Sequence, residues 1–337
     1  PNMSLLSRRR FIALGGSAAW VLSSPIRSLA FPNTDPMKTN NACDVIIVGG
    51  SYSGLAAGMA LGRALRRVLI VDGGQPCNRQ TPRSHNFITH DGRPPKDIAA
   101  LAKQQVERYE TVGFLNGLVT EVTRTERGFD VRVGSILFST KKVVFATGVR
   151  DVMPEIPGFA ECWGISVLHC PYCHGNEVHG ETTGVLGNGE RGFDLVRMIS
   201  NWTKDLTLFT NGPSTLTGEQ KDKLREHGIR IVESGFAELV HLGGQLQHIR
   251  FGDGSTTSLK ALYAQPAFEQ HCPIPQALGC ELTEDGYLQV DPFQRTSIPG
   301  IYACGDNTTR LRTVAGSVAQ GTTAGMMLNK DLIAEEF

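Results

Sequence analysis

The sequence lacks an excess of charge of either sign, and this excludes several classes of protein. Its 33 Lys and Arg residues balance 33 Asp and Glu residues, so the formal net charge is zero. A nucleic-acid partner needs a basic surface that neutralises phosphates, and a balanced chain has no such excess of positive charge. The sequence also has no acidic tail. We therefore expect no nucleic-acid partner.

Cysteines are few for the length of the chain, and long apolar runs are missing. Eight cysteines in 337 residues are too few for a disulfide scaffold. Only Cys170 and Cys173 are closely paired. We interpret the other six as small buried apolar side chains: Cys43, Cys77, Cys162, Cys272, Cys280 and Cys304. No apolar run reaches the about 20 residues that span a bilayer, so we expect no membrane span.

Glycine, in contrast, is abundant. The chain has 38 glycines, 40% apolar residues and 20% charged residues. This composition is typical of a folded α/β protein with glycine turns and argues against disorder. The length suits two domains.

The N-terminal segment has the layout of an export signal. A basic cluster at Arg8–Arg10 precedes an apolar stretch, 11–22, and small residues that end at Ala30. The order Ser-Arg-Arg-x-Phe from Ser7 resembles a twin-arginine signal. We predict a signal peptide over 1–30, a linker over 31–43, and a periplasmic or exported protein. The alternative is a basic tail on a cytoplasmic protein.

The first part of the chain predicts a dinucleotide-binding βαβ unit. A buried strand at 45–48 runs into a glycine turn and a helix, and a second strand ends at Asp72. The turn offers Gly49 and Gly54, with Ser51 at the middle glycine position, which weakens the match slightly. The turn glycines let a pyrophosphate approach the helix N-terminus, and the terminal acid binds a ribose. The alternative is an ordinary tight turn.

Further elements follow in the order expected of such a domain. We predict a helix over 97–109, hairpins between 118 and 138 that turn at Arg127-Gly128, and a strand over 142–148. The Pro-rich and Gly-containing stretch 153–158 indicates a domain boundary. Near the C-terminus, 296–307 predicts a strand and turn, and 315–337 a helix of small residues.

A second unit of the same kind begins at Thr182. Its turn has the full pattern Gly187, Gly189 and Gly192, and its second strand spans 205–209. That strand ends in neither the acid that an NAD site uses nor the cations that an NADP site uses. A nucleotide site and a purely structural turn both remain open.

The cysteine pair sits in Leu168–Glu177, "LHCPYCHGNE", and allows three interpretations. Zinc needs four converging ligands, and the neighbouring histidines point apart, so we expect no metal. A structural staple over so short a loop removes little entropy. A redox-active pair fits best, and its position between two dinucleotide units disfavours a thioredoxin-like domain and favours a pair that faces a flavin.

Together these motifs resemble the thioredoxin reductase family of FAD-dependent pyridine nucleotide-disulfide oxidoreductases. The resemblance covers 44–337 and rests on both glycine turns, the Cys-x-x-Cys pair, "ATG" at 146–148 and "TSIPGIYACGD" at 296–306. It implies an α/β fold of two Rossmann-like, three-layer (ββα) domains. The FAD domain, 44–157 and 284–337, would be split by an NAD(P)H-type domain, 158–283, that carries the cysteines. Members are usually homodimers.

The resemblance also implies roles for single residues. Cys173 would lie against the isoalloxazine ring, Cys170 would exchange with the substrate, and Asp306 would bind the ribityl chain. The residues implied to bind FAD are Gly49, Ser51, Gly54, Asp72, Thr147, Gly148, Gly305, Asp306 and Ala315.

Three departures from the family pattern change the expected activity. After the second strand of the second unit, this chain lacks the basic His-Arg-Arg type motif of thioredoxin reductases. His174 replaces the Asp that usually follows the second cysteine. Near the C-terminus, Val314-Ala315-Gly316 stands where many members have Arg-Gln-Ala. The segment "CPYCHG" and the loop 77–92 are more similar to the gliotoxin-type dithiol oxidases. Those enzymes close disulfides and pass electrons from FAD to oxygen.

We therefore expect an enzyme that oxidises a dithiol, either a small molecule or a thioredoxin-like protein, with His174 as the acid–base group. His169 and His85 are reserve candidates. An NAD(P)H-dependent thioredoxin or disulfide reductase and a flavin redox partner reduced by another protein stay open as alternatives. Export would separate the enzyme from NADPH, which agrees with the weak second site.

Overall fold

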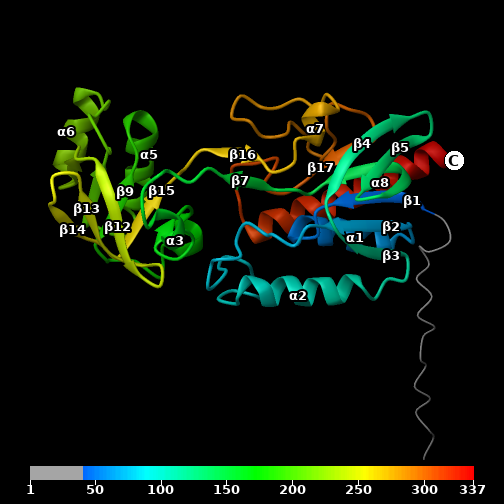
Figure 1. Cartoon of the computed structure of the whole chain (residues 1–337), viewed down its shortest axis with the longest axis horizontal. Coiled ribbons are helices and arrows are strands. Elements are labelled where there is room, and N and C mark those ends of the chain that lie inside the picture. Colours follow the sequence, from blue (N-terminus) through cyan, green and yellow to red (C-terminus); the bar gives the residue numbers. More distant parts are fainter. Residues whose placement is uncertain (1–40) are drawn as a thin grey trace, which may run out of the picture. The chain divides into compact units, whose positions relative to one another are not determined.

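The computed structural model describes residues 41–337 (Figure 1). The predicted signal peptide and nearly all of the predicted linker lie outside these residues. Within the described part, the chain forms a seven-stranded mixed sheet and a five-stranded parallel sheet, each packed against helices and against antiparallel strands, so the predicted fold of two Rossmann-like domains is confirmed.

The first sheet has seven strands in the order β3-β2-β1-β6-β5-β4, with β17 paired to β6. Strands β1, β2, β3, β17 and part of β6 run parallel, while β4, β5 and β6 form antiparallel hairpins. The strands are β1 (Ala42–Val48), β2 (Val68–Asp72), β3 (Val112–Asn116), β4 (Val119–Thr125), β5 (Gly128–Val133), β6 (Ile136–Phe145) and β17 (Ile301–Ala303).

The position of β1 explains why its residues 45–48 are continuously apolar. Val45 and Ile47 pack in the cluster with the helices, while Ile46 and Val48 pack in the cluster with the antiparallel hairpins. Successive side chains of a strand point to opposite faces, so a strand covered on both sides needs apolar residues at every position. The predicted turn at Arg127-Gly128 is confirmed by the pairing of Thr125 with Gly128.

Helices α1 (Tyr52–Arg63), α2 (Pro95–Val106) and α8 (Val314–Glu336) belong to the helical layer (Figure 1). Small residues bring α8 close to α1: a Cβ on Gly321 would lie 2.8 Å from the carbonyl carbon of Ser53. This contact accounts for the small-residue composition of the C-terminal helix. The predicted helix over 97–109 begins earlier, because Pro95 suits the first helical position, and ends at Val106.

The second parallel sheet has the order β11-β10-β9-β15-β8, and a separate antiparallel sheet has the order β12-β13-β14. The strands of the parallel sheet are β8 (Val167–Leu168), β9 (Thr183–Leu186), β10 (Leu206–Phe209), β11 (Arg230–Val232) and β15 (Ala261–Ala264). Those of the antiparallel sheet are β12 (Phe236–Leu242), β13 (Gln245–Phe251) and β14 (Thr256–Ser258). The accompanying helices are α3 (Phe159–Cys162), α4 (Pro171–His174), α5 (Gly189–Ile199) and α6 (Gly218–Glu226).

A two-stranded antiparallel ribbon joins the two parts of the fold. It consists of β7 (Val149–Asp151) and β16 (Phe268–Gln270), which sequence patterns did not reveal. Beyond it, residues around α7 (Ile274–Ala277), such as Leu282, pack against the core of the first sheet. The expected boundary at 283 is therefore too late, because the chain has already returned to the first sheet at Cys272.

Candidate redox site

The first glycine turn connects β1 to α1 and leaves no room for side chains at two positions. Gly49 has φ +106°, and a Cβ there would lie 2.8 Å from the carbonyl carbon of Ala146. A Cβ on Gly54 would lie 3.0 Å from the carbonyl carbon of Gly49. Ser51 is the N-cap of α1 with φ −89°, a conformation open to any residue. The serine therefore does not disturb the turn, and its side chain makes no hydrogen bond that caps the helix N-terminus.

Asp72 ends β2 beside this turn. One carboxylate oxygen, Oδ1, accepts the N–H of Gly50 at 3.1 Å, and the side chain is half-buried. A Cβ on Gly50 would lie 2.8 Å from Cβ of Asp72, so the two residues touch. The second oxygen is left to bind a ligand hydroxyl.

The ends of β6 and β17 meet next to the same turn. Gly148 has φ +64° and Gly305 has φ +93°, and a Cβ on Gly305 would lie 3.1 Å from Cβ of Ser53. Fully buried Asn307 donates from Nδ2 to the carbonyl of Phe145 at 2.9 Å. Its Oδ1 has no hydrogen-bond partner among residues 41–337, so the structure leaves a buried acceptor for another group.

Asn307 also lies close to Thr147, whose hydroxyl is 3.5 Å from its Nδ2. On the α8 side, Gln320 accepts the N–H of Gly305 at 2.7 Å. Sequence patterns did not single out Asn307 or Gln320, and only the proximity of Asn307 to the "CGD" turn could have indicated it.

Asp306 lies in a network of charges. Its carboxylate accepts from the hydroxyl of Ser317 at 3.3 Å and from the thiol of Cys77 at 3.5 Å, and Arg312 Nε is 3.7 Å away. Arg312 also binds Asp151 through two hydrogen bonds of 2.7 and 2.9 Å. Burial raises the pKa of Asp306, and the charge of Arg312 opposes this shift.

Cys77 corrects the expectation that all unpaired cysteines are buried. It is exposed, because it lies in the loop between β2 and α2, and Cys272 is only partly buried. The other four, Cys43, Cys162, Cys280 and Cys304, are buried as expected.

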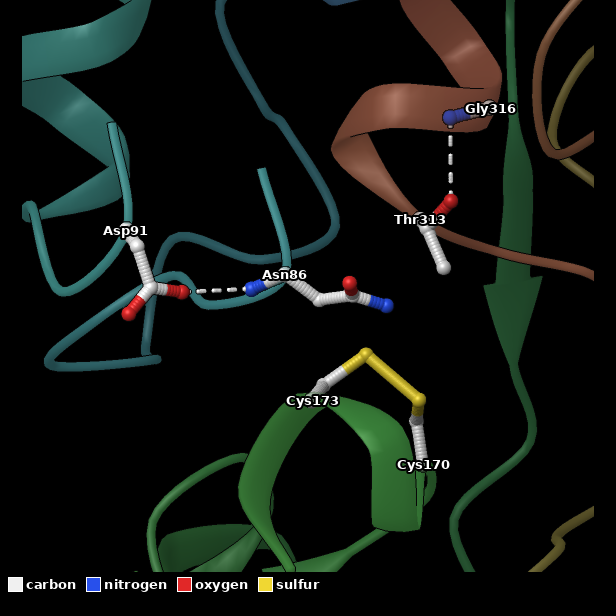
Figure 2. Close-up of a disulfide and its surroundings, with 6 residues drawn as sticks. All are labelled: Asn86, Asp91, Cys170, Cys173, Thr313 and Gly316. Atoms are coloured by element: carbon white, nitrogen blue, oxygen red, sulfur yellow. Dashed lines mark hydrogen bonds between the residues drawn. A yellow bond between two sulfur atoms is a disulfide. The ribbon is translucent and has the colours of Figure 1, made fainter. Parts of the chain in front are cut away.

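Cys170 and Cys173 form a disulfide with a Cα–Cα distance of 5.3 Å. Cys170 is the N-cap of the short helix α4, and Pro171 occupies its first position. Figure 2 shows the disulfide facing the side chain of Asn86 and the first turn of α8 at Thr313. Thr313 caps that helix by accepting the N–H of Gly316 at 3.0 Å, and Ala315 lies in the same turn.

The three candidate histidines differ in environment. Neither ring nitrogen of His174 has a hydrogen-bond partner in the described part of the chain, and burial lowers its pKa. Burial, followed by the charge of Arg312, lowers the pKa of His169 to about 4. His85 lies between two carboxylates, with Nδ1 3.5 Å from Asp91 and Nε2 3.6 Å from Glu177.

The second glycine turn, between β9 and α5, has the expected backbone. Gly189 has φ +56°, and a Cβ on Gly192 would lie 2.7 Å from the carbonyl carbon of Gly187. However, the carboxamide oxygen of Asn188 accepts the N–H of Gly189 at 2.9 Å and that of Thr215 at 2.8 Å. The chain's own side chain thus occupies an N–H group that a pyrophosphate would use.

Two negative findings concern the described residues. Within 41–337, no cluster of three or more His, Cys, Asp or Glu side chains is arranged to hold a metal ion. No helix in that range combines the length and apolar character needed to cross a bilayer.

Comparisons with known proteins agree with this geometry. Residues 43–321 match the family model described as pyridine nucleotide-disulphide oxidoreductase. A thioredoxin reductase of Claviceps purpurea (strain 20.1), tcpT, is 32% identical over 315 residues, which cover 89% of this chain and 97% of that protein.

Two solved structures are similar over most of the chain. The oxidoreductase from Agrobacterium tumefaciens has a TM-score of 0.82 and 34% identity, covering 87% of this chain and 99% of that chain. The putative thioredoxin reductase TrxB from Bacillus anthracis has a TM-score of 0.83 and 29% identity, covering 88% of this chain and 100% of that chain.

Proposed function

The chain belongs to the pyridine nucleotide-disulphide oxidoreductase family, and we propose that within this family it acts as a dithiol oxidase. The resemblance to thioredoxin reductases is confirmed, so the protein is an oxidoreductase of that type, and FAD is the cofactor of that type. The direction of the reaction and the electron acceptor are the proposed part.

The residues present fit FAD. The glycine turn of β1 and α1 would receive the pyrophosphate, Asp72 the ribose, and Asp306 the ribityl chain. The buried, unpartnered Oδ1 of Asn307 and the close approach of Gly305 to Ser53 mark the same place as one built around a bound group. When bound, FAD would supply a two-electron acceptor for the reduced cysteine pair.

The chemistry of the cysteines follows from thiol–disulfide exchange. A substrate thiolate attacks Sγ of Cys170, breaks the Cys170–Cys173 bond and forms a mixed disulfide. The second thiol of the substrate then attacks the substrate sulfur of the mixed disulfide. This closes the substrate disulfide and releases Cys170. The two electrons and two protons of the dithiol are then carried by the reduced thiols of Cys170 and Cys173. With dioxygen as final acceptor, the balance is one dithiol and one O₂ giving one disulfide and one H₂O₂.

His174 would take the proton of the attacking thiol. It follows Cys173 directly, and burial keeps the imidazole neutral near physiological pH by lowering its pKa. A neutral imidazole can accept a proton, whereas an imidazolium cannot. His169, with a pKa of about 4, is a weaker base.

The observation that carries the choice of an oxidase is the second glycine turn. Asn188 takes the Gly189 N–H, and the segment Thr210–Leu216 after β10 contains no charged side chain for a ribose or a 2′-phosphate. A weakly bound nicotinamide nucleotide would leave the dithiol as the electron source. Against this, the positive φ of Gly189 and the tight Gly187–Gly192 contact are those of a nucleotide-binding turn, which favours an NAD(P)H-dependent disulfide reductase as second candidate.

Two further expectations belong to this proposal. Export through a twin-arginine signal would place the enzyme away from NADPH, and N-terminal sequencing of the exported protein would reveal cleavage after Ala30. A homodimer is proposed from the family resemblance, and its mass in solution would test it.

The deciding experiment is the absorbance of the flavin without oxygen. Bleaching by a dithiol alone, with colour and peroxide returning in air, supports the oxidase. Rapid bleaching by NADPH or NADH instead supports the reductase. Cys173→Ser should retain FAD and abolish bleaching by the dithiol, and rapid bleaching of this variant would refute the role of the cysteine pair.

A further inference from the structure

The second parallel sheet defines the path that a dinucleotide would take across its edge. In a dinucleotide-binding unit the pyrophosphate lies on the glycine turn, and the ribose binds at the carboxyl end of the second strand. Here that path runs from the turn between β9 and α5 to residues 210–216, which follow β10. Strands β9 and β10 are parallel neighbours, so both places lie at the same edge of the sheet. A side chain that joins the turn to the 210–216 segment therefore lies across the path.

Asn188, the N-cap of α5, makes this connection with both ends of its carboxamide. Its Oδ1 accepts the N–H of Gly189 at 2.9 Å, the N–H of Thr215 at 2.8 Å and the hydroxyl of Thr215 at 3.1 Å. Its Nδ2 donates to the carbonyl of Pro213 at 2.9 Å. One side chain thus holds the 210–216 segment against the glycine turn.

The closure between the turn and the segment is tight. A Cβ on Gly189 would lie 2.9 Å from Oγ1 of Thr215, so the threonine hydroxyl stands where a phosphate would have to approach the backbone. The segment is also anchored at its far end. Leu216 is buried in the core of this sheet, and Thr217 and Gln220 form a capping box at the start of α6. The segment is therefore a fixed part of the fold.

The charges at the start of α5 also disfavour an anion. Glu190 lies in the first turn of the helix, and its carboxylate accepts a hydrogen bond from Nε2 of Gln220. A carboxylate there interacts favourably with the helix dipole and repels a second anion. Arg191 is a cation in the same turn, but its side chain is 86% exposed and its guanidinium faces Asp285 at 3.7 Å. The helix N-terminus thus already has an anion of its own.

We propose that Asn188 determines the electron donor of this enzyme, because it holds the 210–216 segment over the second glycine turn and so excludes NAD(P)H. The inference rests on the proposed dithiol-oxidase function and names the residue that enforces it. It also explains why a complete glycine pattern occurs without a ribose contact. The glycines keep the backbone of the turn, while the Asn188 side chain occupies the place where the nucleotide would bind.

The test is the binding of NADH and NADPH to the FAD-loaded full chain, measured by isothermal titration calorimetry. We expect Asn188→Gly to lower the dissociation constant of NADH, NADPH or both by about tenfold or more, because the freed N–H groups can bind a charged pyrophosphate. Glycine is nearly as good an N-cap as asparagine, so α5 should keep its start. Asn188→Ala removes the same carboxamide without the flexibility of glycine and should show the same gain.

Asn211→Gly is the matched control. Asn211 lies in the same segment, and its Oδ1 accepts the N–H of Phe236 at 2.7 Å, away from the glycine turn. Its φ of +50° suits glycine. This variant loosens the segment but leaves the bonds of Asn188 in place, so its nucleotide binding should equal that of the wild type. Bound FAD and the melting temperature show that each variant is folded.

Unchanged nucleotide binding in folded Asn188→Gly and Asn188→Ala would overturn the role of Asn188. An equal gain in Asn211→Gly, or a gain in Asn188→Gly that Asn188→Ala does not share, would overturn it as well, because flexibility alone would then explain the effect. The proposed function fails separately: a wild-type flavin that NADH or NADPH bleaches rapidly, or that a dithiol leaves oxidised, would refute the dithiol oxidase itself.

Discussion

Replacing Asp72 by Asn tests whether the first glycine turn is the FAD site. The substitution keeps the size of the side chain and removes its charge. Oδ1 of Asp72 accepts the N–H of Gly50 at 3.1 Å, so the carboxylate orders the turn as well as facing a ribose. Asparagine can still accept one hydrogen bond, but it loses the charge assistance for both the turn and the ribose.

The size of the effect follows from the number of bonds affected. A hydrogen bond to a charged group contributes about 1.5–3 kcal/mol, and 1.4 kcal/mol corresponds to about a tenfold change in affinity. Loss of one such bond to the ribose should therefore weaken FAD binding by about ten- to hundredfold. Stability of the apoprotein should change less, because the turn also keeps its glycine packing.

Titration of apoprotein with FAD, followed by quenching of flavin fluorescence, measures this dissociation constant. Asp130→Asn is the control, since Asp130 is half-buried like Asp72 but binds only the hydroxyl of Ser139 on the hairpin layer. An unchanged FAD affinity in Asp72→Asn, or an equal loss in Asp130→Asn, would refute the assignment of this turn.

Three further substitutions probe the network around the site. Arg312→Met leaves the carboxylates of Asp151 and Asp306 without their cation and should destabilise the holoprotein by about 3–5 kcal/mol in urea unfolding, whereas exposed Arg197→Met should change little. Gly321→Ala forces α8 away from α1 and should cost about 1–3 kcal/mol, measured the same way. Folding lowers the pKa of His169 to about 4, so the unfolded chain binds this proton more readily and stability falls as pH drops from about 6.5 to about 4. His169→Gln should therefore lose less stability over this pH range, as measured by acid unfolding followed by intrinsic fluorescence.

Local patterns determined much of the fold. Three features follow from local physical constraints, which act within a few residues or between adjacent layers. They are the apolar run of β1, the two glycine turns and the small residues of α8. Burial on both faces requires apolar residues throughout, and a close approach of backbones requires glycine. The redox interpretation of Cys170 and Cys173 depended on the same kind of information, because the two cysteines lie in one turn.

The boundary of the inserted segment shows the limit of such patterns. The ribbon of β7 and β16 has only three residues in each strand, too few for a periodic signal. Its pairing exists because the two crossings between sheets run side by side, which no local property specifies.

The site depended still more on tertiary structure. Arg312 and Asp151 are separated by 161 positions, and His85 meets Glu177 from a different part of the chain. Sequence alone ranked His174 first, because it follows Cys173, and kept His169 and His85 as reserves, but it could not show their surroundings. Their ranking comes from burial and nearby charges, which exist only once distant segments have closed around them. The sequence by itself thus determined which chemistry the chain carries, while folding decided which groups can exchange protons, because a pKa depends on surroundings that distant residues supply.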